Sequence, residues 1–193
     1  MRATPNACRI AGAFIALVVT APVVARMLEA NMSTHMLVQI PLLMFAGPLI
    51  GLPLKLALPL RSWNFAGVPV LLAVSLTVTY WMTPIALDHA AANAGWDAAK
   101  SISLILSGAL ALESWRRAPL VVQVFFGGNA IWMGVAAGLL YQARDQRLCN
   151  AYLLDDQVST GVMLLWISIA IGTAWGLRLA TDPHGGHSGR LQG

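Results

Sequence analysis

Residues 118–143 read APLVVQVFFGGNAIWMGVAAGLLYQA, a run of 26 residues without a charged side chain. A helix rises about 1.5 Å per residue, so roughly 20 apolar residues cross the hydrocarbon core of a bilayer. Backbone polar groups in lipid must be paired within their own segment, which favours an α-helix. The run shows no period-two alternation that would indicate a strand. We therefore expect a transmembrane helix here.

The composition of the whole chain excludes most other classes of protein. Of 193 residues, 58% are hydrophobic and only 10% are charged, whereas a soluble chain carries about 25% charged residues. A disordered chain would need low hydrophobicity and many charges. The net charge of +4 is spread too thinly for a nucleic-acid interface, and the two cysteines do not form a disulfide scaffold. The chain is therefore expected to be an integral membrane protein.

Five further uncharged runs, of 16, 19, 26, 12 and 21 residues, lie between charged residues along the chain. The run of 12 is long enough only if Lys100 and Glu113 lie near the two membrane interfaces. We predict an all-α, six-helix transmembrane bundle forming one domain over residues 1–181, with a flexible cytoplasmic tail at 182–193. The expected spans are 10–26, 36–55, 66–87, 97–115, 119–141 and 157–178.

The lysines and arginines predict the orientation of this bundle. With six spans, eight of them fall on the side of both termini and four on the other side. The positive-inside rule then places both termini in the cytoplasm. Residues 1–25 can also be read as a signal peptide cleaved after Ala25, which leaves the remaining topology unchanged.

Pairs of glycines four residues apart occur inside three spans, at 47/51, 134/138 and 172/176. Such pairs let two helix backbones approach closely. We interpret them as packing contacts within the bundle, with dimerisation as the alternative.

Potential metal ligands gather at the outer ends of the expected spans. His35 and Met36 open the second span, Met82 lies near the end of the third, and Asp156 precedes the sixth. Imidazole and thioether ligands suit copper, especially Cu(I), better than zinc or magnesium. The alternative is that methionines fill apolar gaps and that interfaces collect polar residues.

Motifs for other kinds of chemistry are missing from the sequence. It contains no Walker loop, dinucleotide-binding glycine run, nucleophile elbow or zincin motif, so we expect no enzyme. No acid, lysine or arginine is expected at mid-depth in a span, which makes an ion-coupled transporter the weakest interpretation.

Three segments resemble a known family. They are HMLVQ at 35–39 running into LLMFAGPL at 42–49, YWMTP at 80–84 with Asp88, and DDQVSTGVMLLW at 155–166. Together they are similar to the bacterial integral-membrane cytochrome c oxidase assembly factors of the CtaG type. In the family's pattern a second histidine follows the first segment, where this chain has Ile40-Pro41, and a Trp-His pair stands where this chain has Trp81-Met82.

The resemblance implies a function in the bacterial inner membrane. Membership would make the chain an accessory factor that helps load copper into a haem–copper oxidase, handling Cu(I) at the periplasmic face. Besides the lipid bilayer, its partners would be an oxidase subunit or a periplasmic copper chaperone. The alternative is a scaffold of a membrane complex that binds no metal. The positions that carry the family's pattern are His35, Gln39, Pro84, Asp156, Gln157 and Trp166.

Overall fold

The computed structural model describes residues 5–51, 64–143 and 152–181, and all regular structure in these residues is helical. The predicted all-α class is therefore confirmed for the part of the chain that the structure describes. The predicted tail at 182–193 lies outside it. The elements are α1 (Pro5–Thr20), α2 (Pro22–Glu29), α3 (Met32–Thr34), the π-helix η1 (His35–Gln39), α4 (Ile40–Ile50), the 3₁₀ turn η2 (Phe65–Gly67), α6 (Val68–Trp81), α7 (Pro84–Ala92), α8 (Ala94–Arg117), α9 (Leu120–Tyr141) and α10 (Leu154–Thr181).

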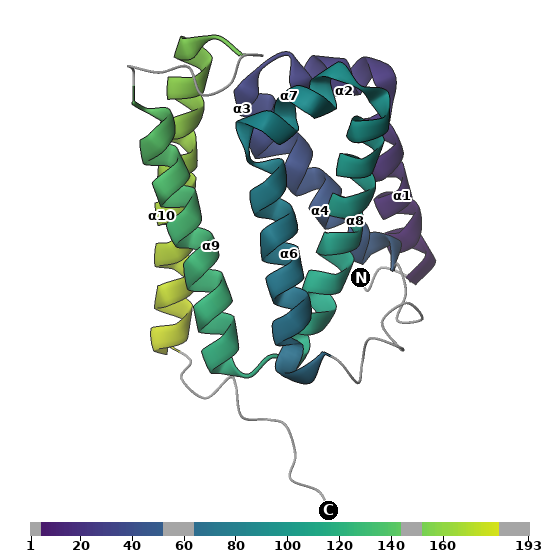
Figure 1. Ribbon diagram of the computed structural model, residues 1–193. Helices are drawn as coiled ribbons and strands as arrows, with labels where there is room; N and C mark the ends of the chain where they lie inside the picture. The colour runs from purple at the N-terminus through teal and green to yellow at the C-terminus, as the bar shows by residue number, and fades with distance from the viewer. Residues whose placement is uncertain (1–4, 52–63, 144–151, 182–193) are drawn as a thin grey trace, which may run out of the picture.

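The long helices run alternately in opposite directions, side by side (Figure 1). The end at which α2, α3 and α7 lie is called the upper end of the bundle here. The turn from α8 to α9 lies at the opposite, lower end, where α1 begins and α10 finishes. The first and last described helices thus have their outer termini at the same end.

Three helical stretches are long and apolar enough to cross a membrane: Met32–Ile50, Leu120–Tyr141 and Leu154–Thr181. The pair α1 and α2 qualifies as a fourth if it forms one broken span, and α6 is apolar but shorter. Helix α8 has the length, with 24 residues, but its charged side chains lower its hydropathy. The chain therefore has the helices of a membrane protein, and the six-span count stays a prediction.

Apolar side chains cover the outer surface of the helices. Leu17, Leu76, Val121, Trp132 and Trp166 are each between 63% and 80% exposed. Soluble monomers rarely expose large contiguous apolar patches. Contact with lipid accounts for such a surface.

Two of the predicted spans are interrupted. The run 10–26 is not one straight helix, because Ala21 has φ −59° and ψ 130° and α2 departs from α1 at 67°. Pro22 is the cause, since a proline disfavours the α conformation of the residue before it. The run 66–87 breaks after Trp81, and Thr83 caps the new helix α7 by accepting a hydrogen bond from the backbone N–H of Ala86.

The remaining spans differ from prediction at their ends. The second begins four residues early, at Met32, and ends where Gly51 adopts a left-handed conformation with φ 63°. Residues 52–55 of that prediction lie outside the described residues. Helices α8, α9 and α10 match the predicted spans 97–115, 119–141 and 157–178 to within three residues at each end.

Glycines bring α4 against α8 and α9 against α10. A Cβ on Gly47 would lie 2.0 Å from the Ile105 oxygen, and one on Gly108 would lie 1.8 Å from the Met44 oxygen. A Cβ on Gly138 would lie 2.9 Å from the Gly161 oxygen. These contacts confirm the interpretation of Gly47 and Gly138 as packing positions within the bundle.

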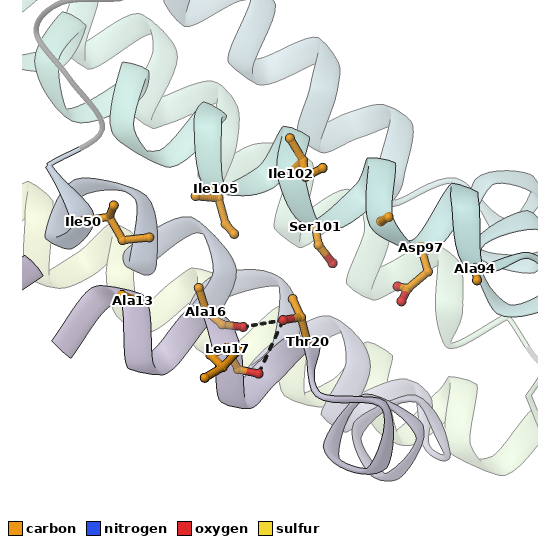
Figure 2. A pocket seen from close by; sticks show the side chains of 11 residues that line it. Ala13, Ala16, Leu17, Thr20, Ile50, Ala94, Asp97, Ser101, Ile102 and Ile105 are labelled. Atoms are coloured by element: carbon orange, nitrogen blue, oxygen red, sulfur yellow. Dashed lines mark hydrogen bonds between the residues drawn. The ribbon is translucent and has the colours of Figure 1, made fainter. Parts of the chain in front are cut away.

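A groove of about 520 Å³ follows α1 and α8 and reaches the end of α4 at Ile50 (Figure 2). Small side chains make room for it, among them Ala13 and Ala16 of α1 and Ala94 and Ala98 of α8.

Candidate functional site at the upper end of the bundle

The start of α3 is fixed by the start of α10. The Asp156 carboxylate accepts hydrogen bonds from the Met32 backbone N–H at 2.5 Å and from the Ser33 hydroxyl at 3.3 Å. The Ser33 hydroxyl also lies 2.8 Å from the Thr160 hydroxyl. An acceptor at the first N–H groups of a helix satisfies donors that have no partner within the helix. Asp156 therefore sets the position of the segment that carries His35.

That segment is a π-helix. In η1, His35–Gln39, the chain is wound more widely than in an α-helix, a feature that often marks functional sites. His35, Met36 and Gln39 are all 2% exposed or less. The π-helix thus carries an imidazole, a thioether and an amide in the interior of the protein.

His35 has no hydrogen bond at either ring nitrogen among the described residues. Its nearest aromatic neighbour is Tyr152, with ring centroids 6.4 Å apart. Buried polar groups are nearly always hydrogen-bonded, and leaving one unpaired costs about 1–3 kcal/mol. The ring nitrogens of His35, like Gln39 Oε1, are therefore buried polar atoms that have no hydrogen-bond partner among the described residues.

Thioethers cluster around the same segment. Met32 and Met36 are buried at 0% and 2% exposure, and the partly buried Met82 packs against the cluster that contains them. Tyr141 belongs to this cluster, and its hydroxyl donates a hydrogen bond to the Met82 backbone oxygen at 3.2 Å. Three methionines, two from the segment Met32–Gln39 and one from the turn after α6, therefore lie in or against one apolar cluster.

The four predicted ligands all lie at the upper end, in different situations. Met36 and Met82 belong to one cluster and His35 lies beside Tyr152 of the same cluster, whereas both oxygens of Asp156 already accept hydrogen bonds. No group of three or more His, Cys, Asp or Glu side chains able to hold a metal occurs among the described residues. A site here would therefore depend on the imidazole and the sulfur atoms.

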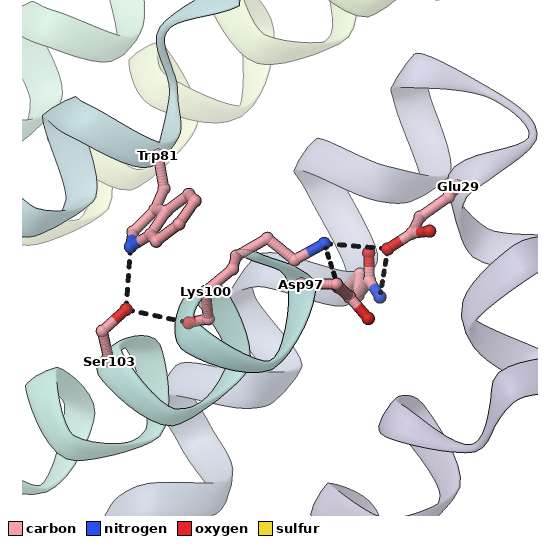
Figure 3. A network of polar contacts seen from close by, with 6 residues as sticks. Glu29, Trp81, Asp97, Lys100 and Ser103 are labelled. Atoms are coloured by element: carbon pink, nitrogen blue, oxygen red, sulfur yellow. Dashed lines mark hydrogen bonds and ion pairs between the residues drawn. The ribbon is translucent and has the colours of Figure 1, made fainter. Parts of the chain in front are cut away.

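A buried ion network lies next to this segment. Lys100 has a side chain with 0% exposure, and its Nζ lies 2.8 Å from Glu29 Oε1 and 2.8 Å from Asp97 Oδ1 (Figure 3). Gln39 Nε2 donates to the same Glu29 oxygen at 3.3 Å. The network thus ties α8 to α2 and reaches the last residue of the π-helix, one turn after His35.

Sequence reasoning missed this network. The sequence predicts only that Lys100 lies near a membrane interface, whereas the structure shows its side chain buried and paired with Glu29 and Asp97. Formally, two carboxylates face one ammonium, so the network has one negative charge in excess. Its supporting contacts continue through Ser103, which donates to the Lys100 backbone oxygen and accepts from the Trp81 indole (Figure 3).

Comparison of the chain with protein-family models, with curated proteins and with solved structures finds no match.

Proposed function

We propose that this chain is a multi-pass protein of the bacterial inner membrane, with six spans and both termini in the cytoplasm. The alternating directions of the helices and the exposed apolar surface support this topology. The bias of lysines and arginines supports the orientation. In this arrangement the upper end, with His35, lies at the periplasmic face.

We further propose that the upper end binds Cu(I). The observation that carries this proposal is the His35 ring, which is buried and accepts or donates no hydrogen bond at either nitrogen among the described residues. It lies beside an apolar cluster that contains Met32 and Met36 and against which Met82 packs. Soft thioether ligands and an imidazole select Cu(I) over hard cations. Asp156, the fourth predicted ligand, then acts by positioning the start of α3.

The family resemblance supports a role for the bound copper. The segments at 35–49, 80–84 and 155–166 resemble those of oxidase assembly factors. In that role the protein, which is not an enzyme, receives Cu(I) at the periplasmic face. It passes the ion toward a haem–copper oxidase, with a copper chaperone or an oxidase subunit as partner.

The alternative is a scaffold without metal, and one observation favours it. The methionines are largely sealed from solvent, so a metal ion could enter only if the upper end opened. In a scaffold, the same cluster would serve only as the apolar core that joins α3, α9 and α10.

A Cu(I) titration distinguishes the two functions. The purified protein is titrated anaerobically against a chromophoric Cu(I) chelator, with His35→Leu and Met82→Leu as site variants. His89→Leu is the matched control, because His89 is exposed and stacks on Trp96 at 5.6 Å. We expect one tightly bound Cu(I) in the wild type and in the control, none in His35→Leu, and weaker binding in Met82→Leu. Wild-type protein that takes no copper from the chelator would refute the copper function and favour the scaffold.

A further inference from the structure

The groove between α1 and α8 is polar at one end and apolar at the other (Figure 2). Asp97 and Ser101 line it near the upper end of the bundle. Toward the lower end its walls are apolar, with Ala13, Ile50 and Ile105. A ligand that matches this groove has a polar head and an apolar tail.

The length of the groove fits one leaflet of a bilayer. Its lining on α8 runs from Ala94 to Ile105, which at about 1.5 Å per residue corresponds to roughly 16 Å. Half of a hydrocarbon core of about 30 Å is about 15 Å. A single acyl chain lying along α8 would therefore occupy the groove from the interface to the bilayer centre.

Ser101 and Asp97, at the upper end of the groove, offer polar contacts to a head group. Ser101 is only 6% exposed, and its hydroxyl forms no hydrogen bond with any residue in the described ranges. The Thr20 hydroxyl, by contrast, already donates to the Ala16 backbone oxygen at 2.7 Å. Ser101 is thus a nearly buried hydroxyl that lines the groove and remains free to bind a ligand.

The charge at this end selects the kind of head group. The Asp97 side chain is 29% exposed, so it can be reached from the groove while it pairs with Lys100. Because Glu29 and Asp97 face a single lysine, the formal charge here is negative. An ammonium group is attracted to this end and an anionic head group is repelled.

We propose that the groove binds one amine-bearing phospholipid of the outer leaflet, such as phosphatidylethanolamine. Its ammonium group donates to the Asp97 carboxylate, an ester or phosphate oxygen accepts from Ser101, and one acyl chain lies along α8. This inference rests on the membrane topology proposed above and not on copper binding.

Lipid retention on the wild-type protein tests whether the groove prefers an amine-bearing head group. The detergent-purified protein is incubated with equal amounts of phosphatidylethanolamine, phosphatidylcholine and phosphatidylglycerol, and bound lipids are counted by native mass spectrometry. Phosphatidylcholine has a cation without N–H donors, and phosphatidylglycerol has no cation. We expect about tenfold preference for phosphatidylethanolamine over each, the effect of one hydrogen bond to a charged group. Equal retention of the three lipids would overturn the assignment.

A pair of substitutions at neighbouring residues tests whether the lipid is bound in the groove. Ala98→Phe fills the groove, whereas Ala99→Phe places the same ring on an exposed residue that does not line it. We expect the first to lose the retained lipid and the second to keep it. Unchanged retention in a folded Ala98→Phe protein, judged by gel filtration, would contradict the proposal. Extraction of the wild type from cells without detergent would instead refute the membrane topology. The copper titration is a separate experiment, and its result does not depend on either the lipid retention or the extraction.

Discussion

Replacing Lys100 by methionine tests the buried ion network. The change keeps an unbranched side chain of similar length and removes the ammonium group that lies 2.8 Å from both Glu29 and Asp97. These two carboxylates, 19% and 29% exposed, would then face each other without a cation. Removing one partner of a buried ion pair costs about 3–5 kcal/mol, because the remaining charge is uncompensated. For a chain of this length that corresponds to a fall in Tm of about 6–20 °C.

Thermal unfolding in detergent, followed by tryptophan fluorescence, measures the effect. A triple variant with Lys100→Met, Glu29→Gln and Asp97→Asn removes the uncompensated charges, so we expect it to recover most of the lost stability. The matched control is Arg117→Gln, which breaks the pair with Glu113 on the outside of α8.

The control should cost no more than about 1 kcal/mol, since exposed pairs contribute little. If Lys100→Met melts at the wild-type temperature, the ammonium group does not hold the upper ends of α2 and α8 together. If the triple variant is as unstable as the single one, the loss comes from packing and not from charge.

Two further substitutions test packing and capping by the same unfolding assay. Gly108→Ala should cost about 1–3 kcal/mol, because the new Cβ would meet a backbone oxygen of α4 at 1.8 Å. Gly128→Ala, with nothing within 4 Å, should be neutral or stabilising by up to about 1 kcal/mol, and equal losses in both variants would contradict the packing. Asp156→Ala should cost about 0.5–2 kcal/mol by removing the acceptor of the Met32 N–H group, while Asp155→Ala, exposed in the same turn, should cost less. If Asp155→Ala is as unstable as Asp156→Ala, the Asp156 carboxylate stabilises only the first turn of α10 and not the start of α3.

The sequence predicts helix positions well where charges mark both ends of an apolar run. Helix α9 differs from its prediction by one residue, because Arg117 and Arg144 bound a long run of apolar side chains. The break at Ala21 was not predicted, although Pro22 is its visible cause. The hydrophobic length of a run thus locates a helix, while its straightness depends on single residues within it.

Contacts between distant residues were harder to foresee. Lys100 and Glu29 are 71 residues apart, and nothing local to either indicates that they pair. The gathering of His35 and Met82 at one end did follow from the expected topology, because both lie near the outer ends of their spans. The π-helix has no compositional signal, so the sequence alone does not predict that His35, Met36 and Gln39 would all be buried.

The arrangement of the bundle across the membrane is the claim from which both proposals start. Single cysteines are introduced into a variant without Cys8 and Cys149, at one position in each of four helix connections and at the end of α10. Intact cells are treated with a membrane-impermeant maleimide before and after lysis. The positions are Ala30, Asn93, Pro119, Ala143 and Thr181.

The account predicts labelling of Ala30→Cys, Asn93→Cys and Ala143→Cys in intact cells. Pro119→Cys and Thr181→Cys should react only after lysis. Labelling of positions 93 and 119 from the same side would show that α8 does not cross the membrane. Labelling of positions 30 and 143 only after lysis would place the His35 end in the cytoplasm and contradict a periplasmic copper site.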